Sequence, residues 1–144
     1  MIRPIAAAET RPLRQRVLRP HQTLDEVGFP GDDAPDAVHF GAFAGAVLVG
    51  IASLLREPPP GSAATGAWRL RGMATAPEVR GGGYGGKLAL ACIEHARAHG
   101  GTFIWCNARV AVADFYRRHG LRAEGSVFEL AGIGPHILMT RALR

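Results

Sequence analysis

Residues Arg80–Lys87 read Arg-Gly-Gly-Gly-Tyr-Gly-Gly-Lys, so five of the eight are glycines. They follow an apolar segment with the pattern of a strand, Ala67–Thr75, and lead into Gly85–His99, whose apolar residues recur at helical spacing. Gly100 and Gly101 end this helix. Backbone N–H groups in a loop at the positive end of a helix bind phosphate groups. The run therefore predicts a strand, loop and helix that bind a phosphorylated ligand; the alternative is a flexible turn without a ligand.

Two nucleotide-binding motifs share part of this spacing. Gly81-x-Gly83-x-x-Gly86 satisfies the dinucleotide pattern, but that pattern needs an acidic residue about 20 residues further on. The segment Thr102–Asn107 offers no carboxylate there. The same glycines, Gly81-x-x-x-x-Gly86, followed by a lysine resemble a P-loop, yet Leu88 stands where a Ser or Thr must hold magnesium. Each motif therefore lacks a chemical group on which its binding depends.

The order of the expected elements indicates the fold class. Apolar periodicity and turn signals give strands and helices in the order β-α-β-β-β-α-β-α-β-β. This order predicts an α+β fold, a central mixed and mostly antiparallel sheet flanked by helices, in a single domain over residues 1–144. The expected strands are Met1–Ile5, Ala37–Ala44, Val47–Leu55, Ala67–Thr75, Thr102–Cys106, Arg122–Leu130 and Ile137–Arg141, and the expected helices are Glu9–Leu18, Gly85–His99 and Val110–His119.

Charge and cysteine content narrow the class of protein. The formal net charge of +5 favours an anionic partner, whether nucleic acid, acidic lipid or a phosphorylated cofactor. The arginines are scattered and expected mostly on solvated surface, and no helix carries the continuous basic stripe of a nucleic-acid binder. No apolar run reaches the roughly 20 residues of a membrane span. Cys92 and Cys106 have no Cys-x-x-Cys spacing, which argues against a disulfide framework and predicts a cytoplasmic protein.

Two further motifs lie in order along the chain. Arg80-x-x-Gly83-x-Gly85, preceded by Gly72-Met73-Ala74-Thr75-x-Pro77, resembles the pyrophosphate loop of the GNAT, or general-control-related, N-acetyltransferase superfamily. The segment Phe115-Tyr116-Arg-Arg-His-Gly120-Leu121 resembles that superfamily's second helix and its exit into the sixth strand. With the element order, the resemblance to small bacterial single-domain members covers essentially the whole chain. It implies an enzyme that uses acetyl-CoA as co-substrate, direct attack by a small amine, and neither a metal nor a covalent enzyme intermediate.

The resemblance also implies a binding mode for acetyl-CoA. The N–H groups of Gly81–Gly86 take the pyrophosphate, and Arg80 adds positive charge. The amide chain of pantetheine pairs like an extra strand with the exposed backbone of Met73–Thr75, where the family's fourth and fifth strands splay apart. The Met73 N–H stabilises the oxyanion of the acetyl carbonyl. The residues expected against the cofactor are Met73, Ala74, Thr75, Arg80, Gly81, Gly82, Gly83, Tyr84, Gly85, Gly86, Asn107, Arg109 and Phe115.

Several side chains are candidates for catalysis or substrate binding. Tyr116 matches the family's acid, which protonates the departing thiolate; the alternative is a buried tyrosine that anchors the core. His136, in a Gly-Pro-His turn before the last strand, is the candidate base because histidine titrates nearest neutral pH, and a structural histidine is the alternative. Cys106 lines the same cavity or is a small buried apolar residue. His95 and His99 have the spacing of two metal ligands without a third, so helix surface is expected.

The fourth strand departs from the family pattern. Many members carry a glutamate there, where this chain has Arg69 and Arg71. Arg71 is therefore a candidate to hold a substrate carboxylate with two parallel hydrogen bonds. In the alternative, both arginines face solvent or pair with Glu78 and Glu124.

The cap of the last helix is a second departure. The family's asparagine falls at Arg109, and Asn107, two residues earlier, is the candidate that replaces it. The missing carboxylate on the fourth strand leaves a non-catalytic acyl-CoA-binding or regulatory module open as an alternative function. The expected partner is a small-molecule amine, with no nucleic acid and no membrane, and a homodimer is left open.

Overall fold

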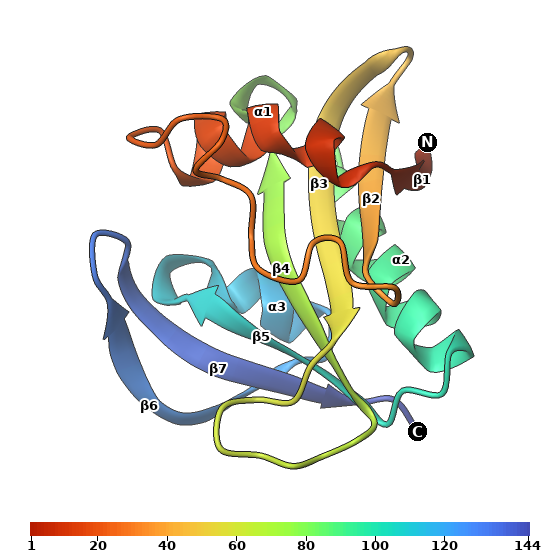
Figure 1. The fold of residues 1–144 in the computed structure, drawn as a ribbon, viewed down its shortest axis with the longest axis vertical. Coiled ribbons are helices and arrows are strands. Elements are labelled where there is room, and N and C mark those ends of the chain that lie inside the picture. The colour runs from red at the N-terminus through yellow and green to blue at the C-terminus, as the bar shows by residue number, and fades with distance from the viewer.

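Seven strands form one mixed sheet (Figure 1). The computed structural model describes residues 1–144, and its strands lie in the order β1-β2-β3-β4-β5-β7-β6. Every neighbouring pair is antiparallel except β4 with β5. The strands are β1 (Ile2–Ile5), β2 (Val38–Ala44), β3 (Val47–Arg56), β4 (Ala67–Thr75), β5 (Phe103–Arg109), β6 (Arg122–Leu130) and β7 (Gly134–Ala142).

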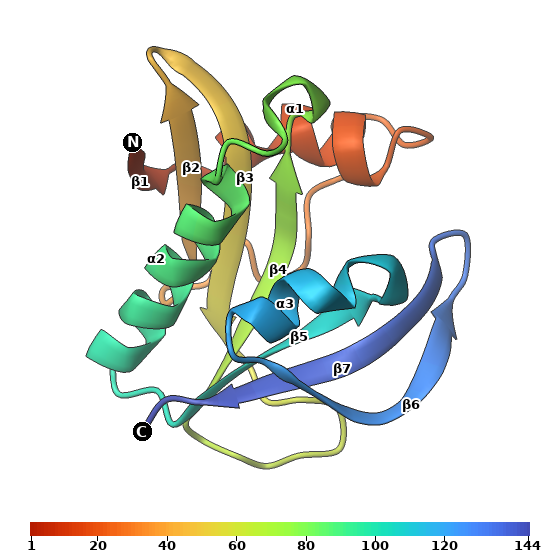
Figure 2. The same cartoon turned by 180° about the vertical axis from the view of Figure 1, so that it is seen from behind.

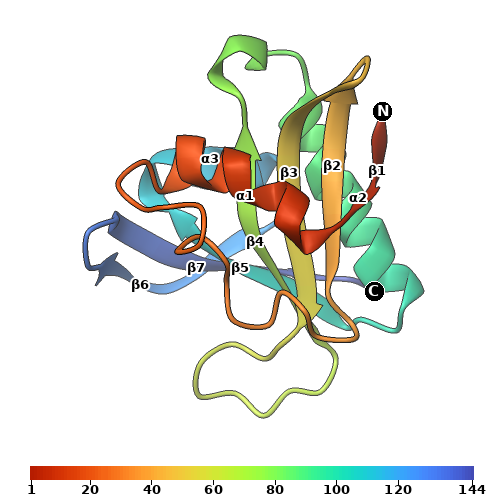
Figure 3. The same cartoon turned by 45° about the horizontal axis from the view of Figure 1, so that its top comes forward.

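Helices cover both faces of this sheet. α2 (Tyr84–Ala98) and α3 (Ala113–Arg118) lie on the face that Figure 2 shows, α2 against β2, β3 and β4, and α3 against β5. An N-terminal helical segment lies on the opposite face, where it crosses β3 and β4 (Figure 3). The remaining helical pieces are η1 (Ala7–Thr10), α1 (Arg11–Leu13) and η2 (Arg14–Leu18) in that segment, η3 (Pro77–Val79) before α2, and η4 (Val110–Val112) before α3.

The main core lies between the sheet and α2. Trp68 and Leu70 of β4 are each 1% exposed and belong to a cluster that includes Leu88 of α2. Burial of a side chain of this size stabilises the fold by about 1.5–3 kcal/mol. Because side chains alternate along a strand, Arg69 and Arg71 lie on the other face of β4, toward the N-terminal segment.

A bulge interrupts β4 after Arg71. In the β3–β4 register, Ile51 is opposite Ala74 and Ser53 is opposite Arg71, so one residue of β3 faces two of β4. Gly72, the first of the two, has a φ of +62°, a left-handed value that glycine adopts without a steric penalty. A bulge of this kind leaves its extra residue outside the ladder and bends the strand. The end of β4 is therefore turned relative to its start.

β4 and β5 separate beyond their first three pairs. Their parallel ladder joins Ala67–Arg69 to Phe103–Trp105 and then ends. β5 stays paired with β7 as far as Arg109, opposite His136, while β4 runs on beside β3. Figure 1 shows the two strands diverging from their shared end. The fourth and fifth strands of this sheet therefore splay apart, as the family resemblance implies.

The element order and fold class agree with the sequence prediction, whereas two strand ends were wrong by three residues. The predicted turn at Gly134–His136 is the start of β7, which pairs with β6 as far as Gly134. The hairpin turn falls at residues 131–133 instead. β5 continues three residues past its predicted end at Cys106, because the ladder with β7 extends it beyond the apolar run. None of the helices is long and apolar enough to cross a membrane.

Candidate active site

The gap between β4 and β5 contains a cavity of about 740 Å³. One wall belongs to η2 and the loop after it, and includes Phe29 and Pro30. The second is β4 from Arg69 to Thr75, and the third is β5 from Cys106 to Arg109. α3 and the β6–β7 hairpin complete the lining. Since η2 and α3 lie on opposite faces of the sheet, the cavity reaches residues on both faces.

Most of the predicted site residues line this cavity, and part of the glycine loop does not. Gly81, Gly82, Gly83, Tyr84 and Gly86 lie outside the wall, in the loop and first turn of α2. The structure therefore gathers the candidate acid, base and oxyanion donor around one space. The predicted residues that line it are Arg71, Met73, Ala74, Thr75, Arg80, Gly85, Cys106, Asn107, Arg109, Phe115, Tyr116 and His136.

The glycine loop joins η3 to α2. Gly81 and Gly83 have φ values of +88° and +82°, and a Cβ added at either would meet nothing within 4 Å. Gly83 is the N-cap of α2, and no side chain bonds to the N–H groups that follow it. The first-turn N–H groups are therefore available to a ligand at the positive end of the helix dipole. The other glycines have close neighbours: a Cβ at Gly82 would lie 3.1 Å from the Tyr84 ring, and one at Gly85 would lie 3.3 Å from the Phe115 ring.

The edge of β4 that faces the cavity has no strand partner after Arg69. Met73, Ala74 and Thr75 line the cavity along this edge, just past the bulge. An edge with free N–H and C=O groups can pair with an extended ligand that carries amides, as it would with an added strand. The backbone N–H and C=O groups of β4 are therefore available to a ligand independently of the side chains of the strand.

Tyr116 lies on α3 and reaches the cavity from the α2 side of the sheet. Its side chain is buried, and its ring meets that of Phe115 edge-on with 5.1 Å between centroids. Burial raises the pKa of Tyr116 well above its usual value, and the nearby Cys106 and Cys92 thiols act in the same direction. The phenol therefore stays protonated at neutral pH, which suits a proton donor.

His136 lies in β7 opposite Arg109 of β5 and Phe128 of β6. It is buried, lines the cavity, and has its Nδ1 2.8 Å from the Gly134 carbonyl oxygen. A carbonyl only accepts hydrogen bonds, so Nδ1 must carry the proton and Nε2 keeps its lone pair in the neutral ring. The contact thus fixes the tautomer that leaves Nε2 able to accept a proton.

Cys106 agrees with both alternatives predicted from the sequence, a cavity-lining residue and a small buried residue. It lines the cavity and is also buried, at 2% exposure. Burial raises the pKa of its thiol to about 12, and the opposing effect of Arg69 is smaller. The group therefore remains a thiol at neutral pH and is a poor nucleophile.

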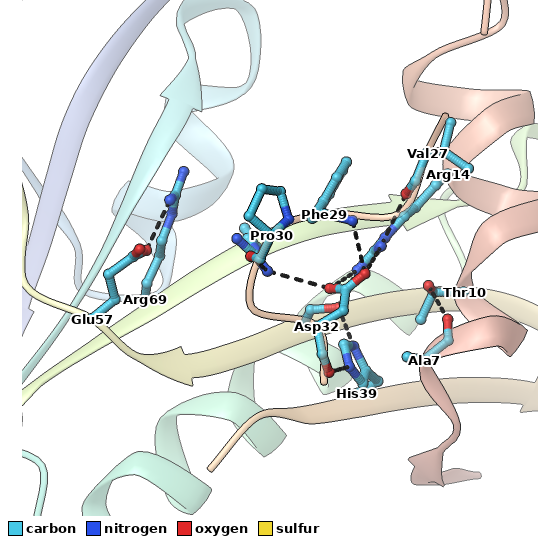
Figure 4. A network of polar contacts seen from close by, with 12 residues as sticks. Ala7, Thr10, Arg14, Val27, Phe29, Pro30, Asp32, His39, Glu57 and Arg69 are labelled. Atoms are coloured by element: carbon cyan, nitrogen blue, oxygen red, sulfur yellow. Dashed lines mark hydrogen bonds and ion pairs between the residues drawn. The ribbon is translucent and has the colours of Figure 1, made fainter. Parts of the chain in front are cut away.

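The partners predicted for Arg69 and Arg71 were wrong. Arg69 Nη1 donates to Glu57 Oε2 at 2.9 Å (Figure 4), and Arg71 donates to the Pro30 carbonyl and to Asp32. Both arginines line the cavity. The carboxylates expected beside them are engaged elsewhere, because Glu78 pairs with Arg16 and Glu124 accepts a hydrogen bond from Thr140.

A buried polar network supports the wall that contains Arg71 (Figure 4). Arg14 donates to both oxygens of Asp32 and to Ser53 Oγ. His39 joins the same group, with Nδ1 2.7 Å from Ser53 Oγ and Nε2 3.0 Å from the Asp32 carbonyl. The carbonyl requires Nε2–H, so Nδ1 accepts from the Ser53 hydroxyl. At each of these contacts a donor meets an acceptor, and Arg14 Nε is the one buried donor of the network without a partner. The contacts fix the loop that holds Asp32 against β2 and β3.

Sequence reasoning missed Arg14, which it counted among the surface arginines. Its side chain is fully buried. A signal was available, because Arg14 is three and four residues before Val17 and Leu18 and so shares the apolar face of its helix. A charged residue on that face needs a buried partner, and only the structure identifies it as Asp32.

The proposed cap of the last helix was also wrong. α3 begins after Val112 without a side-chain cap, whereas Asn107 lies within β5, opposite Leu138. Asn107 still lines the cavity, as does Arg109, which donates to the Leu18 carbonyl at 3.0 Å. Extension of β5 to Arg109 moves both residues from the helix start into the sheet wall.

His95 and His99 form an aromatic contact on α2. Their rings stack with 4.0 Å between centroids, and His95 meets the Trp68 ring edge-on at 5.5 Å. His99 Nδ1 is bonded to the His95 carbonyl. Residues four apart lie on the same face of a helix, so the spacing of the two histidines is explained by their stacking.

A family comparison agrees with this geometry. The model of the Acetyltransferase (GNAT) family matches residues 5–121, from the end of β1 to the residue before β6. The chain belongs to the GNAT acetyltransferase family. It is 36% identical over 144 residues to the Uncharacterized N-acetyltransferase YitI of Bacillus subtilis (strain 168), an alignment that covers 99% of this chain and 96% of that protein.

Solved structures show the same GNAT fold. Escherichia coli ElaA has a TM-score of 0.79 at 19% identity, over 98% of both chains. An aminoglycoside 6'-N-acetyltransferase complexed with coenzyme A has a TM-score of 0.75 at 14% identity, over 100% of this chain and 97% of that one. The GNAT chain described here is thus an α+β, acyl-CoA-dependent N-acyltransferase.

Proposed function

We propose that this GNAT protein transfers an acetyl group from acetyl-CoA to a small amine by direct attack of the amine nitrogen. The observation that carries the proposal is that Tyr116, His136 and the open edge of β4 line one cavity. A protonated phenol and a histidine with a free ring nitrogen are complementary acid and base for an acyl transfer. The cavity also extends toward the glycine loop through Arg80 and Gly85.

Acetyl-CoA supplies an activated thioester, and the residues present fit its chemical groups. The N–H groups between Gly81 and Gly86 bind the pyrophosphate, with Arg80 as a counter-charge. The backbone of Met73–Thr75 pairs with the pantetheine amides along the open edge of β4. No metal ion is included, because N–H donors and Arg80 meet the charge of the pyrophosphate.

The proposed reaction divides three roles among the residues. His136 Nε2 accepts the proton that the amine loses as its nitrogen bonds to the acetyl carbon. The Met73 N–H donates to the carbonyl oxygen as negative charge develops there. Tyr116 then donates its proton to the sulfur as the carbon–sulfur bond breaks. Water restores the two proton carriers after the products leave.

The charge of the cavity bears on the class of amine. One protein with the same fold is an aminoglycoside 6'-N-acetyltransferase. Aminoglycosides are polycations. The cavity here is lined by five arginines and the single carboxylate Glu57, so a polycationic acceptor would be repelled. We therefore favour a small amine without several positive charges. The cytoplasm is the proposed compartment, where the two free and buried cysteines stay reduced.

Two measurements test the proposal. Calorimetry with acetyl-CoA in EDTA should show binding, and a strict requirement for magnesium would contradict the metal-free scheme. A panel of small amines assayed by thiol release from acetyl-CoA should then identify at least one acceptor. If acetyl-CoA binds but no amine supports thiol release, the non-catalytic acyl-CoA-binding module becomes the better description of this chain.

A further inference from the structure

The cavity is lined by many more positively charged than negatively charged side chains. Its arginines outnumber its carboxylates by five to one, since Glu57 is the only acidic side chain in the lining. A concave site with one sign of charge concentrates ligands of the opposite sign. The phosphates of coenzyme A are one such ligand. The position of each arginine therefore determines whether it can bind these phosphates or another anionic group. The five are Arg19, Arg69, Arg71, Arg80 and Arg109.

Arg69 and Arg71 lie on the face of β4 away from the phosphate loop. Trp68 and Leu70, the alternate residues of β4, pack in the core with α2. The glycine loop leads directly into α2, on that side of the sheet. Arg71 instead lies with Phe29, Pro30 and Asp32, on the face that carries η2. Arg69, two residues before it in β4, lies on the same face of the strand. Both arginines are therefore placed for a ligand group other than the pyrophosphate.

The positive charge of Arg71 is only partly compensated by the chain. Asp32 is its nearest carboxylate, at 3.3 Å, but both oxygens of Asp32 already accept from Arg14 at 2.6 and 3.0 Å. The Phe29 N–H adds a further bond to that carboxylate, at 2.9 Å. Two nearly buried guanidinium groups thus share one carboxylate. Burial lowers the pKa of Arg71, Asp32 opposes this effect, and Arg69 and Arg14 add to it.

Arg69 extends the same surface. Glu57 neutralises part of its charge at 2.9 Å, and that carboxylate is 41% exposed. The guanidinium also lies over the Trp105 ring, 5.0 Å from its centroid, which holds its plane beside the cavity. Arg69 Nε and Arg71 Nε are both buried without a partner in the chain. Neither guanidinium therefore has its hydrogen-bonding capacity met by the protein.

We propose that Arg71, assisted by Arg69, binds an oxyanionic group of the acceptor, so that the acceptor is a small amine that also carries a carboxylate or a phosphate. The inference rests on the proposed acetyl transfer and adds the substrate class. A guanidinium matches the two oxygens of either anion with parallel hydrogen bonds. Phe29 completes the subsite, because it lies under Arg71 with 5.4 Å from the ring centroid to the guanidinium carbon.

The experiment uses matched acceptors that differ only in the anion. Amino acids are compared with their own carboxamides, with aminoalkylphosphonates of equal length and with a linear diamine, by thiol release. The wild type should use the anionic acceptors at least about tenfold better in kcat/KM, because hydrogen bonds between two charged groups are stronger than those between neutral groups. Preference for carboxylate or for phosphonate identifies which anion the subsite takes. Equal use of acids, amides and diamine would overturn the proposal.

Two variants connect the preference to Arg71. Arg71→Met keeps an apolar stem and removes the charge, and it should erase the preference of acids over amides mainly by raising KM. Arg71→Lys keeps the charge without the planar fork and should give an intermediate ratio even if the Met variant folds poorly. Arg117→Met, on the surface of α3, is the matched control and should retain the wild-type ratio. An unchanged ratio in both Arg71 variants would also overturn the proposal.

A binding measurement separates this inference from the proposed function. Calorimetry of amino acids against the coenzyme A complex should show binding to the wild type and a Kd raised at least about tenfold in Arg71→Met. Acetyl-CoA itself should bind both proteins equally. If acids bind in this pattern but no amine releases thiol, the acetyl transfer fails and the anion subsite stands. If amides and diamines are acetylated as well as acids, the transfer stands and the anion subsite fails.

Discussion

Arg14 and Asp32 form a two-pronged buried ion pair, with Nη1 2.6 Å from Oδ2 and Nη2 3.0 Å from Oδ1 (Figure 4). The pair joins η2 to the loop that precedes β2. Arg14 also donates to the Val27 carbonyl at 3.1 Å, and its guanidinium lies 3.9 Å from the centroid of the Phe29 ring. The loop that carries Phe29 and Pro30 into the cavity wall is therefore tied to η2 through one arginine.

Arg14→Met should strongly destabilise the protein. The substitution leaves Asp32 with the Phe29 N–H and with the longer contact from Arg71 as its one remaining ion pair, and breaking a buried pair from one side costs about 3–5 kcal/mol. Denaturant unfolding measures the change. Arg117→Met, which breaks the exposed pair with Asp114, should cost less than about 1 kcal/mol. A stability of Arg14→Met within 1 kcal/mol of the wild type, about the cost of an exposed pair, would show that the pair does not support the fold.

Ionisation of Asp32 should make the free energy of unfolding depend on pH in the acid range. Burial alone would raise its pKa, but hydrogen bonds from Arg14 and from the Phe29 N–H outweigh burial and hold the pKa below its usual value. In the unfolded chain the carboxyl titrates near pH 3.9, roughly as in peptides. The contribution of ionised Asp32 is therefore complete above about pH 4 and is lost as pH falls through the lower folded pKa.

The test of this linkage compares Asp32→Asn with the wild type. The variant should be less stable at pH 7, and the difference should shrink as pH falls below about 4. Unfolding curves at several pH values measure both effects. Asp33→Asn, at the exposed neighbouring residue, is the control and should track the wild type. A constant gap between Asp32→Asn and the wild type down to low pH would contradict the assignment.

Gly83→Val should weaken coenzyme A binding. Gly83 has a φ of +82°, which a β-branched residue does not readily adopt, and its side chain would project from the loop proposed to hold pyrophosphate. We expect Kd to rise at least about tenfold, or about 1.4 kcal/mol. Gly45→Val is the matched control, because Gly45 has a φ of +62° in the β2–β3 turn and open space around it. Equal losses of affinity in both variants would indicate a general effect on stability.

Tyr116→Phe should separate binding from turnover. The change removes one oxygen and keeps the ring against Phe115, so acetyl-CoA affinity and thermal stability should change little. Turnover should fall on the order of 10²-fold or more if the phenol protonates the leaving thiolate. Because burial raises its pKa, ionisation of this phenol should cause no loss of wild-type activity near pH 10, about where free tyrosine titrates. Full activity in Tyr116→Phe would remove the acid assignment.

His136→Gln should impair turnover in a pH-dependent way. Without the ring nitrogen, the proton that the amine loses during attack must go to solvent, so kcat/KM should fall about 10²-fold or more at neutral pH. The deficit should narrow as pH rises, because hydroxide then replaces the missing base. His21→Gln, at an exposed loop residue, controls for loss of a histidine. A deficit that is the same at every pH would indicate a structural role for His136.

Short sequence patterns determined the order of elements and the glycine loop. Alternation predicted the strands, and Gly120 correctly marked the end of α3, because each signal acts over a few residues. The run Arg80–Lys87 likewise predicted the loop before α2, since the left-handed φ values of its glycines are local properties. Tyr116 could be placed on its helix for the same reason. Ends of strands were less certain, because ladder partners far along the chain extend them, as β7 extends β5 to Arg109.

Only the tertiary structure decided which charged groups meet. The sequence left Arg71 with Glu78 or Glu124 as partners, but the fold gives it Asp32, 39 residues away, and gives Glu78 to Arg16. Arg14 is buried because the loop after η2 folds over it and places the Asp32 carboxylate beside it. Charge pairing depends on separations of a few ångströms, and distances between segments far apart in sequence are set by packing of the whole chain. The sequence therefore determined the fold and the glycine loop, whereas packing decided the charge of the cavity wall that contains Arg71.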